Sequence, residues 1–351
     1  MSTVSVKKND KILRDLRTPP ADRPELYARA DAVRRERNGD AVPLRGIIEF
    51  SNVCVSDCAY CGLRRSNRAL RRYSMPADEI LDVARRMAAW GQMTVVLQSG
   101  EAPSRDGDRA LGELIARIKR ETPLAVTVSV GNRPRAVFAY WRDCGMDRYL
   151  LRFETSDPEL YRRLHDGGEL SDRLACLRDL QDLGVQTGSG FMIGLPGETI
   201  GRLAEHIRLC ADLDLDMIGI GPFIPNPDTP MGGARNAWAD DPEMFFVALA
   251  ALRLACPEAH IPATTAYDAA FPGVGRNRAL RCGANVFMPN NTPGRYRRDY
   301  QLYPNKPCVD EDAGDCAVCV QLRLKAIGRE IDTGPGHGVR CRPFADSPAC
   351  A

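Results

Sequence analysis

Residues 46–61 read Gly46-Ile47-Ile48-Glu49-Phe50-Ser51-Asn52-Val53-Cys54-Val55-Ser56-Asp57-Cys58-Ala59-Tyr60-Cys61, an apolar strand that runs into a loop with three closely spaced cysteines. Their spacing is C-x₃-C-x₂-C, and no histidine or further cysteine follows before Cys144. A structural zinc site requires four protein ligands and usually draws on a second cysteine or histidine pair nearby. Three local thiolates without a local fourth are more typical of an iron–sulfur cluster in which one iron stays open.

An open iron beside a cubane suits the reductive cleavage of S-adenosylmethionine (SAM), because the amino and carboxylate groups of SAM chelate that iron. The triplet Cys54, Cys58 and Cys61 is therefore interpreted as the ligand set of a [4Fe–4S] cluster. The alternative is that the three thiols are buried or redox-active cysteines that hold no cluster.

Short strands rich in valine and isoleucine alternate with helix-period stretches along the rest of the chain. The expected strands are Gly46–Phe50, Thr94–Gln98, Ala125–Val130, Tyr149–Phe153, Gln186–Ile193, Met217–Pro222, Ile261–Thr265 and Asn285–Met288. The expected helices are Ala77–Trp90, Arg109–Arg120, Pro134–Cys144, Ser171–Leu183, Ile200–Leu213, Pro242–Cys256 and Phe271–Arg281. This α/β alternation predicts a (β/α)₈ barrel of the TIM type.

An open doubly wound sheet is disfavoured, because no Gly-rich dinucleotide turn follows the first strand. We expect residues 1–43 to form an N-terminal helical cap and residues 44–305 to form the barrel. A C-terminal extension follows, with a helix and a second cysteine group at 306–332 and a disordered tail at 333–351 that is rich in glycine, proline, arginine and alanine.

The composition excludes several classes of protein. A net charge of +2 over 351 residues gives no electrostatic case for a nucleic-acid or membrane-surface partner. The N-terminal residues lack the apolar region of a signal peptide, and no run of 18 apolar residues occurs. We therefore expect a cytoplasmic protein whose 13 cysteines are metal ligands or reduced thiols rather than disulfides.

Polar residues interrupt the strands where their carboxyl ends are expected. Each alone is also explained as turn or helix-capping chemistry. In a barrel the carboxyl ends of the strands share one face, so these groups are expected to face the cysteine loop together. They are Ser51-Asn52, Gln98-Ser99-Gly100-Glu101, Ser129, Arg152-Phe153-Glu154-Thr155, Gly221 and Thr264-Thr265.

The functional groups of SAM suggest roles for three of these segments. The stretch that carries Ser99 and Glu101 is expected to meet the amino group, and Glu154 the ribose hydroxyls or the amino group. Arg173 is suited to pair with the carboxylate through its guanidinium group. From the residues alone, a surface arginine of a helix is the favoured interpretation of Arg173.

The cluster loop and several later blocks resemble HydE, the radical SAM maturase family of [FeFe]-hydrogenase. The similarity covers about residues 20–330, and the related biotin synthases and methylornithine synthases match these blocks less well. The blocks are Glu49–Cys54 with Cys58–Arg65, Leu97–Glu101, Asp147–Arg152, Ile218–Pro225 with Asp228–Pro230, Ile261–Ala266, Leu280–Asn285 and Tyr300–Pro304.

The resemblance implies a radical SAM enzyme of hydrogenase maturation. The 5′-deoxyadenosyl radical would act on the sulfur of a cysteine-bound Fe(CO)₂(CN) species on the way to the di-iron subcluster. The implied partners are the maturase that supplies this species, a scaffold maturase and an electron donor of the flavodoxin or ferredoxin type. The implied cofactor-binding residues also include Tyr60, Ser129, Thr264, Thr265 and Tyr300. Met217 and Met288 are candidates to line the substrate lumen, and packing in the core is the alternative for both.

A second triplet, Cys308, Cys316 and Cys319, has the spacing C-x₇-C-x₂-C. It resembles the accessory cluster site of part of the HydE family, which would hold a [2Fe–2S] or [4Fe–4S] cluster that activity does not require. From the residues alone, zinc with Cys341 or Cys350 as the fourth ligand remains open.

One residue departs from the resemblance, since Phe153 stands where the HydE family usually has histidine. This departure puts any role of an imidazole there in doubt. Two other functions stay open: a radical SAM enzyme like methylornithine synthase or biotin synthase that acts on an amino acid or small organic substrate, and a non-catalytic cluster carrier.

Overall fold

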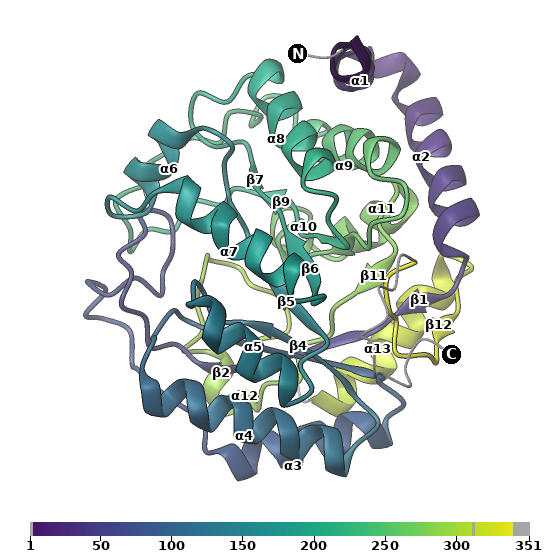
Figure 1. Cartoon of the computed structure of the whole chain (residues 1–351). Coiled ribbons are helices and arrows are strands. Elements are labelled where there is room, and N and C mark those ends of the chain that lie inside the picture. Colours follow the sequence, from purple (N-terminus) through teal and green to yellow (C-terminus); the bar gives the residue numbers. More distant parts are fainter. Residues whose placement is uncertain (1–2, 311–312, 340–351) are drawn as a thin grey trace.

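A closed ring of parallel strands forms the centre of the molecule, and helices surround it (Figure 1). The computed structural model describes residues 3–310 and 313–339. Six strands pair in the order β2-β3-β4-β5-β6-β8, and β10 pairs with β11. Bridges from Met217 to His260 and from Leu44 to Phe287 close the ring. The strands are β2 (Arg45–Ser51), β3 (Thr94–Ser99), β4 (Ala125–Ser129), β5 (Arg148–Leu150), β6 (Gln186–Ser189), β8 (Met217–Ile218), β10 (Pro262–Ala263) and β11 (Val286–Phe287).

Two further short strands, β7 (Met192–Ile193) and β9 (Gly221–Pro222), extend β6 and β8 toward the carboxyl face. The extension depends on Gly190, which has a φ of +151°. A Cβ atom at this position would lie 1.9 Å from the carbonyl oxygen of Gly219. The eight predicted strands are confirmed in kind and order, and the fold is the predicted (β/α)₈ barrel.

The outer helices bury one apolar face each against the ring, and their side chains form the two large core clusters of the protein. Side-chain caps mark several starts: Ser104 accepts from the Gly107 amide before α4, and Thr199 accepts from the Arg202 amide before α8. These helices are α3 (Ala77–Ala89), α4 (Arg105–Glu121), α5 (Arg135–Asp143), α7 (Leu170–Asp182), α8 (Ile200–Asp212), α9 (Met244–Ala255) and α11 (Gly275–Arg281).

The N-terminal segment covers α9, whose residues from Met244 to Arg253 are buried on every side. It consists of α1 (Thr3–Leu16), a 3₁₀ turn at Pro20–Asp22, α2 (Arg23–Asn38) and β1 (Val42–Pro43). Figure 1 shows α1 and α2 beside α8 and α9, and Arg23 donates to Asp241 at 2.7 Å. The sequence of α9 is apolar all round because this cap replaces solvent on its outer face.

Three helical segments differ from the expectations. The chain forms α6 (Pro158–Leu164), which sequence periodicity did not predict, capped by Asp157. The single helix expected at Phe271–Arg281 is wrong in its bounds: α10 (Thr265–Ala270) ends before Pro272-Gly273, where Gly273 has a φ of +77°, and α11 begins at Gly275. Beyond the barrel lie α12 (Gly294–Arg297), α13 (Ala313–Ala326) and β12 (Ile331–Asp332), which pairs with β1.

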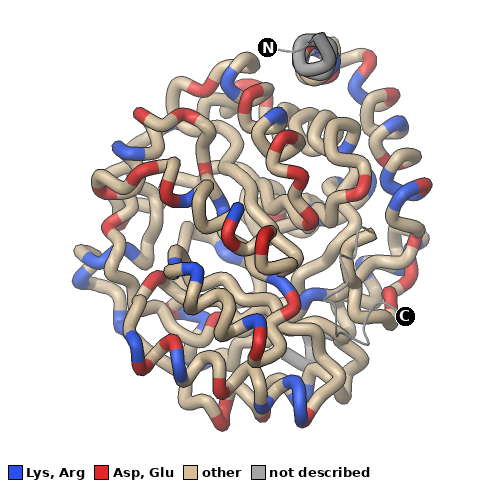
Figure 2. Tube along the Cα trace, in the orientation of Figure 1, with Lys and Arg blue, Asp and Glu red and all other residues tan. Residues whose placement is uncertain are grey.

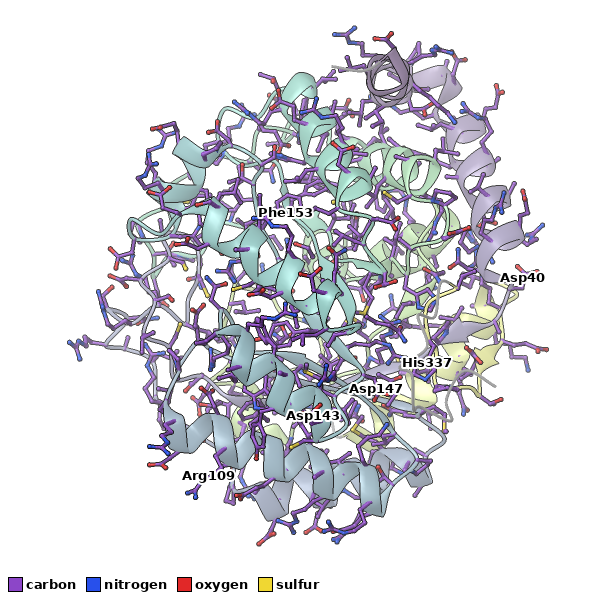
Figure 3. The ribbon with its side chains drawn as sticks, in the orientation of Figure 1. Asp40, Arg109, Asp143, Asp147, Phe153 and His337 are labelled. Carbon is purple, nitrogen blue, oxygen red and sulfur yellow. The ribbon has the colours of Figure 1, made fainter. Side chains whose placement is uncertain are left out.

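The prediction of a disordered tail from residue 333 is wrong for residues 333–339; residues 340–351 lie outside the described residues. The segment packs against the amino end of the barrel, where the Pro335 carbonyl accepts from Arg148 at 2.7 Å. His337 lies beside the start of β5 (Figure 3), with its Nδ1 atom 2.9 Å from Arg148. The carbonyls and imidazole of this segment supply partners for buried arginines, a long-range interaction that composition does not reveal.

Positive and negative side chains are interspersed over the helices (Figure 2). In the part of the chain that the structure describes, every helix is too short or too polar to cross a membrane.

We expect Gly190→Ala to reduce the free energy of unfolding by about 3 kcal/mol or more, because its methyl group would collide with the Gly219 backbone. Gly201→Ala in the first turn of α8 is the matched control: its Cβ would meet nothing closer than 3.7 Å, and a gain of about 0.5–1 kcal/mol is expected. Urea unfolding of the cluster-free protein, followed by circular dichroism, measures both. Equal stabilities of the two variants would contradict the packing described for β6 and β8.

Candidate functional site

A cavity of about 330 Å³ opens at the carboxyl face of the barrel. Its walls come from the cluster loop, from the ends of the strands and from the segment after α12. Sixteen side chains carry its chemistry: Glu49, Cys54, Cys58, Tyr60, Cys61, Ser99, Glu101, Ser129, Arg152, Glu154, His165, Arg173, Thr264, Thr265, Tyr300 and Lys306. Of the polar strand ends predicted to face the cysteine loop, those after β3, β4, β5 and β10 line this cavity, whereas Ser51, Asn52 and Thr155 are buried outside it.

The loop that carries the three cysteines is held by its own side chains. Asp57 accepts hydrogen bonds from Arg64 Nε at 2.8 Å and from the amide and hydroxyl of Ser66. The bond from Arg64 contributes most to holding the pKa of Asp57 well below its usual range. The loop is tied to β3 as well, since the Val55 amide donates to the Glu101 carbonyl at 2.7 Å.

Arg72 organises the far side of the same loop. Its guanidinium group donates to the carbonyls of Asn52, Leu63 and Arg64 at 2.6–2.8 Å. Five donors in a rigid fork suit the arginine side chain to gather several carbonyls at one point. The backbone that carries the thiols is thus preorganised by the protein alone.

The thiols of Cys54, Cys58 and Cys61 are partly buried and line one cavity. Burial, reinforced by the neighbouring thiols, raises the pKa of Cys58 to about 12 and raises that of Cys61. Thiols in such a site become thiolates when a positive centre replaces their protons.

Among the side chains that the structure describes, no three from His, Cys, Asp or Glu are arranged around a single metal ion. A mononuclear site needs thiolates that converge to about 2.3 Å from one ion, whereas a cubane offers a separate iron to each thiolate. The donor set and its spacing therefore fit a [4Fe–4S] cluster, held by Cys54, Cys58 and Cys61.

Glycines leave room beside the thiols. A Cβ atom on Gly100 would lie 2.4 Å from the Val53 carbonyl and 2.9 Å from Cys54 Cβ. A Cβ atom on Gly131, whose φ is +84°, would lie 2.3 Å from a carboxylate oxygen of Glu101. The close approach of β3 to the cluster loop explains Gly100, and the Glu101 side chain beside the end of β4 explains Gly131. Ser99 and Ser129 line the cavity at the same level.

Arg173 and Glu101 form an acid–base pair in the cavity. Their nearest atoms lie 4.0 Å apart, and Arg173 Nε donates to the Tyr161 hydroxyl at 2.9 Å. The side chain is only 13% exposed and lines the cavity, so the interpretation of Arg173 as a surface arginine is wrong. A cation beside an anion at this spacing is complementary to the carboxylate and ammonium groups of an amino acid.

Glu154 reaches the cavity from a strained turn. Its φ is +62°, and the Thr155 amide donates to the Phe153 carbonyl at 2.7 Å across it. Arg152 lies 2.9 Å from the Glu154 carboxylate. Burial raises the pKa of Glu154 despite this cation and Arg173.

Tyr60 and His165 form a contact that sequence reasoning missed. The Tyr60 hydroxyl lies 3.1 Å from His165 Nε2, and the imidazole stacks on Tyr161 with ring centroids 3.9 Å apart. Burial, with a smaller contribution from the nearby Arg173 cation, lowers the pKa of His165 to about 4. No motif surrounds His165 in the sequence, because its partner is 105 residues away.

Threonines, tyrosines and Met288 also line the cavity. Thr264 donates to the Ile220 carbonyl at 3.0 Å, and the Thr265 and Tyr303 hydroxyls lie 2.6 Å apart. Tyr300 accepts from Gln98 Nε2 at 3.2 Å. Burial raises the pKa of both tyrosines, so they act as neutral hydroxyls.

A buried ion pair joins Lys306 to Glu49 in the cavity wall, and sequence reasoning missed it. Asn290 Nδ2 donates to the second Glu49 oxygen at 3.1 Å, and the Lys306 ammonium lies 4.9 Å from the centre of the Tyr300 ring. A carboxylate inside an otherwise apolar strand was the available signal for Glu49. No comparable signal marks Lys306.

Two further sequence expectations concern the methionines of the substrate lumen and the phenylalanine at position 153. Met217 lies at the amino end of β8, packed against Gly188 and Leu150 and outside the cavity, so its placement in the substrate lumen is wrong; Met288 does line the cavity. Phe153 is fully buried and stacks on Phe191 with centroids 6.0 Å apart (Figure 3). Position 153 therefore faces the core rather than the cavity.

The accessory cluster on Cys308, Cys316 and Cys319 remains a prediction. Cys308 is partly buried with a φ of +61°, and Cys319 is exposed on α13. The side chain of Cys316 lies outside the described residues, as do Cys341 and Cys350.

Comparison with known proteins places this geometry in a family. The profile of the Radical SAM superfamily matches residues 48–251. The "[FeFe] hydrogenase maturase subunit HydE" of Thermotoga maritima is 46% identical over 91% of this chain and 89% of its own length. The "3-methylornithine synthase" of Methanosarcina barkeri is 30% identical over 74% of this chain and 73% of its own. The crystal structure of a methylornithine synthase aligns with a TM-score of 0.78 at 26% identity, covering 93% of this chain and 97% of that one.

We expect Lys306→Met to destabilise the protein by about 3–5 kcal/mol, because it leaves the Glu49 carboxylate buried without its cation. The double variant Glu49→Gln/Lys306→Met removes both charges and should regain most of the loss. Urea unfolding of the cluster-free variants measures the difference. A single variant as stable as the parent would contradict the burial of this pair.

The titration of His165 predicts a pH dependence. The folded protein holds its pKa near 4, below the ordinary value of about 6.5 in an unfolded chain. Its contribution to stability is therefore present above pH 6.5 and is lost as the pH falls toward 4, where only the unfolded chain binds the proton. His165→Gln cannot titrate, so its unfolding free energy should fall less than that of the parent between these pH values. Parallel pH profiles of the two proteins would contradict the buried, neutral imidazole.

Proposed function

The chain belongs to the HydE family of the radical SAM superfamily, and on this premise we propose that it acts on a cysteine-bound Fe(CO)₂(CN) species on the way to the di-iron subcluster of [FeFe]-hydrogenase. The observation that carries the proposal is one continuous cavity, lined both by the three thiols and by a further set of charged and hydroxyl groups. When bound, the reduced [4Fe–4S] cluster and SAM supply a 5′-deoxyadenosyl radical.

The cluster half of the cavity holds SAM in a defined orientation. Arg173 binds the carboxylate of SAM, and the Glu101 side chain beside it accepts from the ammonium group. Glu154 accepts from the ribose hydroxyls, and Tyr60 with Ser129 borders the nucleoside. These assignments are supported by the spacing of the charged groups and by the glycines that let the backbone approach.

Arg152, Thr264, Thr265, Tyr300 and Met288 bind the iron species. Arg152 contributes a guanidinium group whose Nε lacks a hydrogen-bond partner among the described residues, which suits a carboxylate such as that of cysteine. Thr264, Thr265 and Tyr300 supply hydroxyl groups, and Met288 a soft apolar contact. Enclosure by these side chains excludes water from the reacting atoms.

The proposal includes partners. A one-electron donor of the flavodoxin or ferredoxin type reduces the cluster, a second maturase supplies the iron species, and a scaffold maturase receives the product. The reaction is assigned to the cytoplasm, where thiols are kept reduced. Cys308, Cys316 and Cys319 are assigned to an accessory iron–sulfur cluster of the [2Fe–2S] or [4Fe–4S] type.

The likeness to methylornithine synthase keeps a second function in view, a radical enzyme that acts on an amino acid or another small organic substrate. A cell-free maturation assay separates the two. Cluster-free hydrogenase is incubated with the other maturases, with and without this protein, and hydrogen evolution is measured. Activation that requires this protein supports the proposal, and full activation without it contradicts the proposal.

We expect Cys58→Ala to abolish the formation of 5′-deoxyadenosine from SAM under anaerobic reduction, because the [4Fe–4S] cluster loses a ligand. Cys316→Ala should leave this cleavage largely intact. Quantified 5′-deoxyadenosine, normalised to the protein concentration, is the measurement. An equal loss in both variants would contradict the division between catalytic and accessory cysteines.

A further inference from the structure

We propose that His206, held between Ser156 and Glu198, is a positioning residue that keeps Glu154 aimed into the cofactor half of the cavity. The inference rests on the proposed function, since it takes Glu154 to be a ligand of SAM. His206 touches neither the cavity nor the reacting atoms, so it acts only through the backbone that carries Glu154.

The turn at Glu154 needs an external support. A non-glycine residue with φ near +62° is in a strained conformation that persists only where the surroundings impose it. On the sheet side, the Glu154 amide donates to the Gly190 carbonyl at 2.9 Å, and the Glu154 carbonyl accepts from the Met192 amide at 3.1 Å. These bonds fix Glu154 to its neighbouring strand but leave the chain that follows it to other contacts.

His206 supplies the contact on that following chain. The Ser156 amide donates to the Nδ1 atom of the imidazole at 3.1 Å, and the Ser156 hydroxyl oxygen lies 2.7 Å from the same atom. A nitrogen that accepts from a backbone N–H carries no proton, so the ring proton lies on Nε2. Nε2 faces the Glu198 carboxylate at 3.4 Å.

Glu198 and Phe191 fix the imidazole itself. The second carboxylate oxygen of Glu198 accepts from the Gly194 amide at 2.8 Å and from Trp238 Nε1 at 2.7 Å. The Phe191 ring lies 5.1 Å from the imidazole and also stacks on Phe153, directly before Glu154. The residues on both sides of Glu154 therefore contact one buried unit formed by Phe191, Glu198 and His206.

A hydrolytic triad is the other interpretation of serine, histidine and glutamate in this order, and the geometry argues against it. The imidazole nitrogen that would serve as base is engaged by the Ser156 main-chain amide. His206 and Glu198 are buried, and none of the three residues lines the cavity. A positioning role uses every contact that the three residues make.

The test pairs two substitutions of similar size. In His206→Asn the side-chain oxygen takes the place of Nδ1 and still accepts from Ser156. In His206→Gln the amide reaches the place of Nε2 and contacts Glu198, but the acceptor for Ser156 is lost. Loss of a residue that orients a ligand-binding side chain typically lowers the affinity of the site about 10- to 100-fold. The dissociation constant of SAM should therefore rise about tenfold or more in His206→Gln and stay close to the parent in His206→Asn.

Equilibrium dialysis of SAM against the oxidised, cluster-loaded protein provides the readout without turnover, at matched iron and sulfide content. Glu154→Gln and the double variant Glu154→Gln/His206→Gln complete a double-mutant cycle. If His206 acts through Glu154, the double variant binds SAM no more weakly than Glu154→Gln. Additive losses, equal losses in His206→Asn and His206→Gln, or unchanged affinity in His206→Gln would each overturn the proposal.

If His206→Gln does not load a cluster, Ser156→Ala enters the same cycle, because it removes only the hydroxyl contact with Nδ1. A smaller loss that vanishes in the Glu154→Gln background supports the proposal, and a loss that persists there overturns it. If Glu154→Gln alone leaves SAM affinity unchanged, the positioning proposal is overturned while cleavage of SAM by the parent protein still tests the proposed function separately.

Discussion

Parallel pairing around a closed ring sends the carboxyl end of every strand to the same face of the molecule, and the site depends on this constraint. The loop after β2 carries the thiols, and the ends of β3, β4 and β5 supply Glu101, Ser129 and Arg152 around it. β3 can approach the loop closely because Gly100 has no side chain, and Gly131 leaves room for the Glu101 carboxylate. Residues separated by more than 200 positions thus surround one cavity.

The charges in this cavity are arranged in pairs. Arg173 lies near Glu101, Arg152 lies near Glu154, and Lys306 is bound to Glu49. A buried charge without a partner is costly, so pairing keeps the cavity stable before any ligand enters. The first two pairs are loosely aligned, whereas Glu49 has a further bond from Asn290. Loosely aligned pairs can exchange partners with a zwitterionic ligand at small cost, and the tight pair retains its structure.

Much of the fold and the centre of the site followed from local patterns. The period of apolar residues located the strands, and the spacing of Cys54, Cys58 and Cys61 indicated an open cluster. Polar residues at strand ends, Glu154, Thr264 and Thr265 among them, were predicted by the rule that such ends share a face. Arg173 was named because its guanidinium group suits a carboxylate, and the resemblance to HydE added Tyr60; both line the cavity.

Other features depended on contacts between distant segments. Met217 was misplaced because a two-residue strand does not reveal which layer of the barrel its side chain occupies. The tail at 333–339 was expected to be disordered because its composition does not show that buried arginines bind its carbonyls. The side chains of His165, His206 and Lys306 bond to partners 50 or more residues away in the sequence. No local pattern marks such residues.

The most direct test of the account is an anaerobic reaction of the reduced, cluster-loaded protein with SAM and a synthetic cysteine–iron–carbonyl–cyanide complex. Samples frozen during the reaction are measured by electron paramagnetic resonance, with isotopes placed in the complex. The account predicts a paramagnetic species whose hyperfine couplings report the labelled complex, formed together with 5′-deoxyadenosine. Formation of 5′-deoxyadenosine at the same rate with and without the complex, and with no signal coupled to its labels, would contradict it.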